Sequence, residues 1–387
     1  MSAEPGPFRC EVPQQVLEDL RERLASTRWP DEINDADWSY GTDQATLRAL
    51  CDYWRSDFDW RQSEAQLNAF PQYTTRIDGH ELHFIDAPSP EPDALPLVIT
   101  HGWPGSVFEF LEVIEPLRDP RAHGGQASDA FHVICPSIPG YGFSQAASEP
   151  GMHPRRVSQM IASLMGRLGH ARYGAQGGDW GSVISQGLGV VDPEHCMGIH
   201  LNMISASRPN DDPMSGVSEE EKEIFERARR VREEEMGYFR IQSTRPQTLG
   251  TALNDSPAGL ASWILEKFRA WSDCPSDGRG DEPLFRVFTK DQLLANITLY
   301  WVTGTITSST RLYLETVRAT GLSPIQHRVP LGCAAFPGEL VRSPRAWVER
   351  QFDLRHWTEM PRGGHFAALE QPALFVDDVR AFFRKLR

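Results

Sequence analysis

The sequence contains no long apolar run. No window of its 387 residues reaches the ~18 consecutive apolar residues that a membrane-spanning helix requires. The first ten residues, MSAEPGPFRC, lack the basic and apolar regions of a signal peptide. We therefore expect a cytoplasmic protein with no membrane partner.

Cysteine, lysine and net positive charge are also scarce. The six cysteines form no CxxC pair and no cluster, which indicates reduced core thiols, so we expect neither a metal nor a cofactor. The 39 basic residues, four of them lysines at positions 222, 267, 290 and 385, face 53 acidic ones. A net charge of −14 disfavours nucleic acid as a partner, and the arginine bias suggests a high-GC bacterial genome.

The periodicity of apolar residues divides the chain into four parts. Residues 1–73 show helical spacing, as at Leu17, Leu20 and Leu24, and we expect them to pack as a cap on the rest. Residues 75–85 alternate on both sides of Asp78-Gly79, a strong signal for a β-hairpin. From there to residue 203, short apolar strands alternate with helices, the pattern of a parallel α/β sheet.

The alternation stops near residue 204, and residues 204–320 are predicted to be a helical insertion. Within it, the charge runs 219–221 and 233–235 are expected on a solvated helix face. Residues 321–387 return to the α/β core with a strand at 329–336 and a final helix at 372–386. The prediction is an α/β fold, a mostly parallel twisted sheet flanked by helices, with a helical insertion and an N-terminal helical segment.

The central motif is QGGDWGS at residues 176–182, between a predicted strand and a predicted helix. Glycines two residues before and two residues after Asp179 define a nucleophile elbow, a turn so tight that only small neighbours fit. On the motif alone, an ordinary turn or a helix-capping aspartate is an open alternative. The wider context favours Asp179 as a nucleophile.

That context begins with HGWPGS at residues 101–106, directly after another buried strand. In α/β-hydrolases this loop supplies one backbone N–H of the oxyanion hole, and the residue after the nucleophile supplies the other. The donors would be Trp103 and Trp180, whose side chains either line the substrate pocket or simply pack. His101 is interpreted as holding the loop.

A base and an acid must follow the nucleophile in this fold. His365 lies in a Gly-Gly loop before the last helix and is the predicted general base. Glu339 follows the strand at 329–336 and is the predicted orienting acid. Glu349, Asp353 and Glu359 compete for that role, but they fall within or beyond the next helix.

These motifs, together with LRERLASTRWPD at residues 20–31, resemble the epoxide hydrolases of the microsomal type over nearly the whole chain. The resemblance implies an α/β-hydrolase fold whose insertion is a lid, with Tyr238 and Tyr313 donating protons to the epoxide oxygen. It implies an epoxide substrate, bulky or aryl, and water, in detoxification or natural-product biosynthesis. Relatives often form dimers, so a homodimer is possible, and we expect a protein without the N-terminal anchor of the membrane-bound members.

Aspartate suits this chemistry because a carboxylate opening an epoxide forms an ester, which water can cleave, whereas serine would form a stable ether. A haloalkane dehalogenase is the nearest alternative, since it shares the Asp-Trp-Gly elbow. Halide-binding donors would be needed there in place of the two tyrosines. A catalytically silent binding protein is a second alternative, although Asp179, His365 and the loop glycines are all present.

Overall fold

A tight turn at Asp78-Gly79 forms the predicted hairpin within the sheet. Both residues adopt positive φ angles, +50° and +80°, which the two central positions of a type I′ turn require. The turn joins β2 (Gln72–Ile77) to β3 (His80–Ala87) as an antiparallel pair in which Ile77 faces His80. The predicted hairpin is therefore present.

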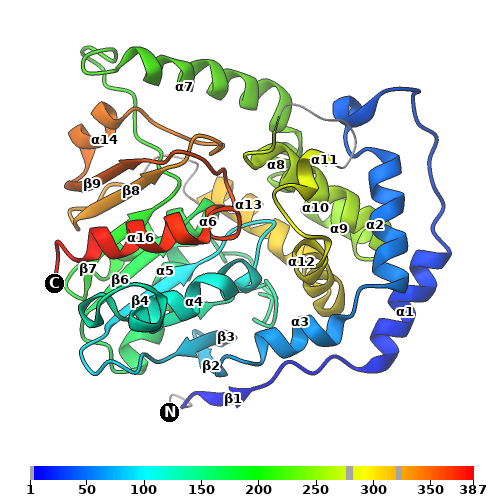
Figure 1. The fold of residues 1–387 in the computed structure, drawn as a ribbon, viewed down its shortest axis with the longest axis horizontal. Helices are drawn as coiled ribbons and strands as arrows, with labels where there is room; N and C mark the ends of the chain where they lie inside the picture. The colour runs from blue at the N-terminus through cyan, green and yellow to red at the C-terminus, as the bar shows by residue number, and fades with distance from the viewer. Residues whose placement is uncertain (1–3, 276–281, 320–324) are drawn as a thin grey trace.

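In the described part of the chain, nine strands form one sheet in the order β1-β2-β3-β5-β4-β6-β7-β8-β9 (Figure 1). The pairs from β1 to β5 are antiparallel, and those from β5 through β4 to β9 are parallel. The computed structural model describes residues 4–275, 282–319 and 325–387 and confirms the predicted α/β fold. The remaining strands are β1 (Gly6–Phe8), β4 (Leu95–Thr100), β5 (Phe131–Pro136), β6 (Tyr173–Gly177), β7 (Cys196–Leu201), β8 (Leu331–Ala335) and β9 (Leu354–Glu359).

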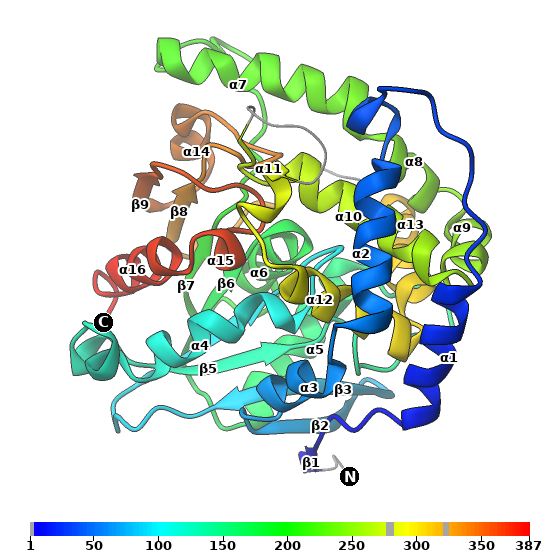
Figure 2. The same ribbon diagram turned by 45° about the vertical axis from the view of Figure 1, so that its right-hand side comes forward.

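Helices cover both faces of this sheet. On one face α4 (Leu111–Arg118) packs beside α16 (Pro372–Phe383), and on the other α5 (Pro154–Arg167) packs beside α6 (Asp179–Val191) (Figures 1 and 2). Because the central parallel strands are covered on both sides, they read as continuous apolar runs, as in β4. Short helices complete the core: η2 (Val107–Phe110), η3 (Pro120–His123), η4 (Ala127–Asp129), α14 (Arg345–Gln351) and α15 (Ala367–Glu370).

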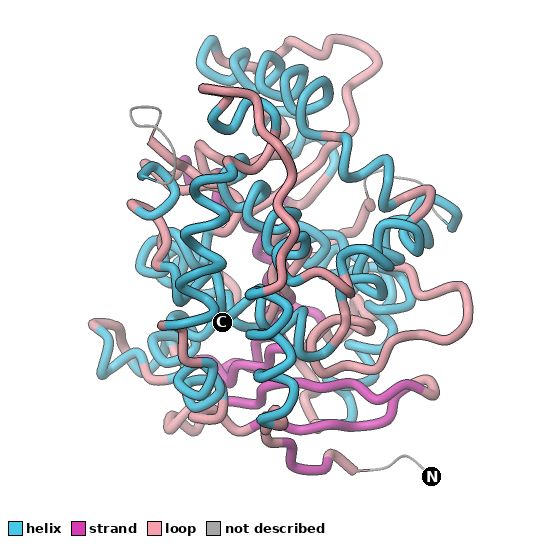
Figure 3. The backbone as a smooth tube through the Cα atoms, turned by 90° about the vertical axis from the view of Figure 1, so that its right-hand side faces the viewer, coloured by secondary structure: helices cyan, strands magenta, loops and turns pink. Residues whose placement is uncertain are grey.

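The N-terminal segment is not wholly helical, contrary to the prediction. It contains α1 (Gln14–Ala25), η1 (Asp37–Tyr40), α2 (Gln44–Ser56) and α3 (Trp60–Leu67), but its strand β1 pairs with β2 at the sheet edge. Three residues containing Gly6 and Pro7 carry no strand signal of their own, so only the pairing with β2 makes them a strand. Figure 3 shows this edge at the base of the molecule, with helices stacked above it.

Between β7 and β8 the described residues form seven helices and one π-helical turn, here called the insertion helices. α1 and α2 contact α10, and α3 contacts α12, so the N-terminal segment braces the insertion helices (Figure 1). The predicted boundary at residues 320–321 lies outside the described residues. The insertion helices are α7 (Glu219–Arg230), π-turn η5 (Val231–Glu235), α8 (Gly237–Gln242), α9 (Pro246–Leu253), α10 (Pro257–Trp271), α11 (Glu282–Phe285), α12 (Lys290–Thr303) and α13 (Ile306–Ala319).

Direct bonds join the N-terminal helices to the insertion helices. Arg23 pairs with Asp255 at 2.8 Å, and the Tyr53 hydroxyl donates to Asp291 at 2.9 Å. Throughout the described ranges, no helix combines the length and the apolar character needed to cross a membrane.

Candidate active site

The turn between β6 and α6 lifts Asp179 above the end of the sheet. Asp179 has a φ of +47°, a strained conformation for a residue with a Cβ atom. A Cβ atom at Gly177 would lie 2.1 Å from the Gly181 carbonyl oxygen, and one at Gly181 would lie 1.8 Å from that of Thr100. The two glycines are therefore required by main-chain contacts on both sides of the turn.

The loop after β4 meets the Asp179 carboxylate from the side. The Trp103 backbone N–H donates to Asp179 Oδ1 at 2.8 Å. A Cβ atom at Gly102 would lie 2.3 Å from Asp179 Cβ, so only glycine permits this approach. Because α6 begins at Asp179, the Trp180 N–H belongs to the first helical turn, where N–H groups have no acceptor within the helix. The backbone N–H groups of Trp103 and Trp180 are therefore both placed beside Asp179.

His101 holds this loop from below. Its Nε2 accepts from the Ile138 backbone N–H at 3.1 Å, and its Nδ1 contacts the Gly102 carbonyl at 3.0 Å. Burial lowers the pKa of His101 to about 4, so the ring is neutral and can both donate and accept. These bonds agree with its interpretation as a loop-holding residue.

His365 reaches Asp179 from the loop after β9. Its Nε2 lies 3.4 Å from Asp179 Oδ2, and its Nδ1 lies 2.8 Å from Glu339 Oε1. Burial alone would lower the pKa of His365, but attraction to Glu339 and hydrogen bonds with Asp179 and Glu339 raise it well above its ordinary value. The structure thus brings together the predicted nucleophile, base and acid.

The three competing acids lie elsewhere. Glu349 pairs with Arg345, Asp353 with Arg355 and Glu359 with Arg342. Glu339 instead reaches His365 because its loop presses against the histidine loop: the Gly338 N–H donates to the Gly363 carbonyl at 2.8 Å.

Tyr238 from α8 and Tyr313 from α13 close the site from the insertion side. Both are buried, and the Tyr238 ring stacks on Trp103, with centroids 5.3 Å apart and planes 7° apart. The Tyr313 ring meets Trp180 edge to face at 4.8 Å, and the two tyrosine rings are 5.9 Å apart. The pKa of Tyr238 is raised well above its ordinary value, mainly by burial and secondly by the negative charge of Asp179. The pKa of Tyr313 is raised in the same way, mainly by burial and secondly by its neighbours Tyr238 and Asp179.

The buried polar atoms of this aromatic cluster lie close to one another. The Tyr313 hydroxyl interacts with Tyr238 and with Trp180, whereas the Trp103 indole nitrogen has no hydrogen-bond partner among the described residues. Since buried donors normally find acceptors, these groups can donate to a bound ligand. The four aromatic side chains thus form an apolar wall that carries hydrogen-bond donors.

Sequence reasoning missed the residues that hold the histidine loop. Glu370 accepts from the backbone N–H groups of Asp273, Gly364 and Phe366, each at 2.9 Å. Burial raises the pKa of Glu370 to about 7, although the three N–H groups favour its charged form. No local sequence pattern marks this role, because Asp273 comes from the end of an insertion helix.

The prediction that Glu235 lies on a solvated helix face is also wrong. Glu233 and Glu234 are exposed as predicted, but Glu235 accepts from the Trp271 indole N–H at 3.3 Å and lies 3.7 Å from Lys267 Nζ. A π-helical turn ends at Glu235 and brings it inward. The charge run is therefore only partly on a solvated face.

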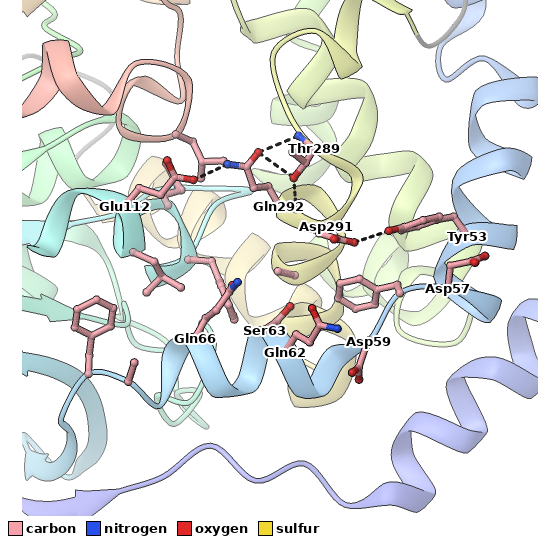
Figure 4. Close-up of a pocket in the computed structure, with 18 residues that line it drawn as sticks. Tyr53, Asp57, Asp59, Gln62, Ser63, Gln66, Glu112, Thr289, Asp291 and Gln292 are labelled. Carbon is pink, nitrogen blue, oxygen red and sulfur yellow. Dashed lines mark hydrogen bonds between the residues drawn. The ribbon is translucent and has the colours of Figure 1, made fainter.

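Two cavities adjoin the loops around Asp179. A cavity of about 20 Å³, room for about one water molecule, is bounded by Asp179, His365, Trp103 and Glu109. A larger pocket of about 640 Å³, the outer pocket, opens among α3, α4 and α12 (Figure 4). Glu109 borders both cavities, whereas Asp179 and His365 border only the small one. The predicted nucleophile and base therefore belong to the small cavity, despite its size.

The outer pocket has an acidic wall. In Figure 4 the Gln292 amide donates to Glu112 at 2.8 Å, beside the Tyr53–Asp291 hydrogen bond. Burial, opposed by His365, raises the pKa of Glu109 to about 8. Among the described residues, the wall contains five carboxyl side chains and no basic one: Asp57, Asp59, Glu109, Glu112 and Asp291.

The sheet, the strained elbow and the loops after β4, β8 and β9 define an α/β-hydrolase. A family model described as "alpha/beta hydrolase fold" matches residues 96–244, and one described as "Epoxide hydrolase N terminus" matches residues 5–110. The chain belongs to the epoxide hydrolase family, in its microsomal-type branch, and is an enzyme of that class.

Individual relatives span nearly the whole chain. A Stigmatella aurantiaca relative, assigned by name to the epoxide hydrolases, is 46% identical over 98% of this chain and 85% of its own. Epoxide hydrolase 1 of Sus scrofa is 40% identical over 97% of this chain and 88% of its own. The crystal structure of juvenile hormone epoxide hydrolase from Bombyx mori is 32% identical, with a TM-score of 0.91 over 100% of this chain and 95% of that one. These relatives favour epoxide hydrolysis over the dehalogenase and binding-protein alternatives.

Proposed function

We propose that this enzyme converts an epoxide to a vicinal diol through an ester formed on Asp179. The observation that carries the proposal is the aspartate at the elbow, with a base 3.4 Å from its carboxylate and two buried tyrosines opposite. A carboxylate nucleophile gives an ester that the adjacent base can hydrolyse. We also propose that the insertion helices act as the lid over this site.

In the first step, one oxygen of Asp179 attacks an epoxide carbon. The bond from that carbon to the ring oxygen breaks, and Tyr238 or Tyr313 gives the departing oxygen its proton. Raised phenol pKa values keep both tyrosines protonated at neutral pH, so they are available as donors.

In the second step, His365 takes a proton from water, and the hydroxide adds to the Asp179 ester carbonyl. The backbone N–H groups of Trp103 and Trp180 stabilise the resulting oxyanion. As the intermediate collapses, protonated His365 returns its proton to the departing alcohol oxygen, and the proton left on the Asp179 carboxyl restores the tyrosine, so that the Asp179 carboxylate and the diol remain. Glu339 fixes the ring orientation of His365 and stabilises its charged form.

Ester formation itself prepares His365 for its role. The negative charge of Asp179 contributes to the raised pKa of the histidine, and esterification removes that charge. The pKa of His365 should then fall, leaving more of the neutral form that acts as a base. His365 therefore becomes an effective base only after the ester on Asp179 has formed.

The apolar aromatic wall supports a bulky or aryl epoxide as substrate, which can enter only when the wall opens, because the cavity beside Asp179 has a volume of about 20 Å³. Trp103, Trp180, Tyr238 and Tyr313 surround the reactive carboxylate with apolar surface. Styrene oxide is a suitable probe because it combines an aryl ring with a small epoxide. A panel of epoxides of graded size would define the limit of the pocket.

Isotope labelling tests the covalent route. In a single turnover of styrene oxide in H₂¹⁸O, the heavy oxygen should enter Asp179, detected by peptide mass spectrometry. His365→Gln should accumulate the ester as an intact-mass adduct, and the Tyr238→Phe/Tyr313→Phe double variant should form none. Label found only in the diol would refute the ester, and ring opening by the double variant would refute the proton donors.

A further inference from the structure

A buried lysine lies directly behind Tyr238. The Lys267 ammonium is 4.9 Å from the centroid of the Tyr238 ring and 5.6 Å from that of Trp271. Because Trp103 stacks in parallel on one face of Tyr238, the opposite face is the one open to the ammonium. The Lys267 side chain is only 7% exposed, in a protein with four lysines. Such burial of a charge is costly unless it is compensated.

Two glutamates compensate this charge. Lys267 contacts Glu266 directly, and Glu235 Oε2 lies 3.7 Å from its Nζ. Glu235 is fixed in turn by the Trp271 indole N–H at 3.3 Å. The π-helical turn that brings Glu235 inward ends three residues before Tyr238. The fold therefore builds a charged cluster against one catalytic tyrosine and none of its members touches Asp179.

A cation over an aromatic face is attracted to the π electrons and draws electron density from the ring. In a phenol this makes the hydroxyl a stronger hydrogen-bond donor. The effect acts at the moment when the epoxide oxygen gains negative charge, and it is strong because the site is buried. It opposes burial and the negative charges of Asp179, Glu235 and Glu266, all of which raise the pKa of Tyr238 and make its proton harder to release.

We propose that Lys267 is a positioning residue for epoxide ring opening: its ammonium holds the Tyr238 ring against Trp103 and strengthens the Tyr238 hydroxyl as a proton donor. This inference rests on the proposed role of Tyr238. It assigns to Lys267 an effect on ester formation and none on ester hydrolysis, since water attack on the ester uses His365.

Single-turnover kinetics separate the two steps. After rapid mixing with styrene oxide and acid quenching, the esterified fraction is measured by intact-mass spectrometry against time. Lys267→Met should slow ester formation about tenfold and leave ester hydrolysis unchanged, whereas Lys267→Arg, which keeps a cation, should recover most of the rate. A merely structural role would slow both steps or neither.

Lys290 offers a matched control. Its ammonium lies 5.1 Å from the Tyr53 ring and 5.4 Å from that of Phe285, away from Asp179. Lys290→Met removes the same kind of contact and should leave both rates unchanged. Loss of ester formation in this variant would mean that removing any lysine–aromatic contact perturbs the enzyme.

A double variant guards against misfolding. Lys267→Met alone leaves Glu266 and Glu235 facing each other without their cation. Lys267→Met/Glu266→Gln removes one opposite charge as well and should form the ester more slowly than Glu266→Gln alone, because Glu266 itself raises the pKa of Tyr238. Equal ester formation in these two folded variants would overturn the role of Lys267. If wild-type enzyme forms no ester, the proposed function fails; if Tyr238→Phe slows ester formation but Lys267→Met does not, only this inference fails.

Discussion

Replacing Gly181 by alanine adds a single methyl group beneath the nucleophile. The new Cβ atom would lie 1.8 Å from the Thr100 carbonyl oxygen and 2.9 Å from that of His101. Reaching even a tight 3.0 Å from Thr100 requires a movement of 3.0 − 1.8 = 1.2 Å. Both neighbours are main-chain atoms, so α6 must move away from β4 as a unit.

The energetic cost follows from this displacement. Overpacking typically costs 1–3 kcal/mol, and a main-chain clash belongs near ~3 kcal/mol. Alanine regains ~1 kcal/mol of helix propensity over glycine, which leaves a net loss of about 2 kcal/mol. Activity should suffer more, since a shift of about 1 Å between the Asp179 carboxylate and the Trp103 N–H can lower kcat/KM about 100-fold.

Gly166 supplies the control for this experiment. It lies in α5, and a Cβ atom there would meet no atom within 4 Å. Gly166→Ala should therefore stabilise the protein by up to about 1 kcal/mol without changing kcat/KM. Urea unfolding and styrene oxide turnover measure both variants. If Gly181→Ala matches Gly166→Ala in stability and activity, the steric account of the elbow is wrong.

Three further substitutions test charged groups. Glu339→Gln should slow ester hydrolysis about 100-fold while ester formation continues, so that single-turnover mass spectra show accumulated ester; equal slowing of both steps would contradict the orienting role. The folded-state pKa of Glu109, about 8, exceeds its ordinary value of 4.5, so folding stability should fall as pH rises from about 4.5 to 8. The Tm gain of Glu109→Gln over wild type should grow across that window, and a constant difference would refute the shift. Asp378, buried between His200 and His356, has a lowered pKa whose stabilisation is lost as pH falls below its ordinary range. Asp378→Asn should cost about 3 kcal/mol in urea unfolding at neutral pH, with kcat/KM unchanged, and a loss below 1 kcal/mol would contradict it.

The parts of the site that the sequence predicted are those fixed by local geometry. Gly177 and Gly181 reveal the elbow because the turn leaves no room for a Cβ atom at either position. His365 is visible because it lies in a Gly-Gly loop, where Gly338 and Gly364 pack with no space for side chains. Such constraints act within a few residues or exclude all but glycine, so a single sequence displays them.

The parts that it did not predict depend on distant partners. β1 becomes a strand only because β2, more than 60 residues later, offers it an edge. Glu370 holds the histidine loop together with Asp273, a residue 97 positions earlier. Glu235 resembles its exposed neighbours in sequence, and only the π-helical turn sends it inward. Neither the composition nor the periodicity of the sequence indicates these long-range contacts.

Trp271 shows why such pairings matter for catalysis. Its carbonyl accepts the His365 backbone N–H at 3.0 Å, its ring lies 5.0 Å from that of Tyr238, and its indole N–H donates to Glu235. The residue at the end of α10 therefore contacts both His365, the proposed base of the second step, and Tyr238, a proposed proton donor of the first. Since α1 and α2 pack on α10, the N-terminal segment supports this junction as well. A displacement of α10 would move Tyr238 and His365 together, so we expect the position of this one insertion helix to set the geometry of both proposed steps.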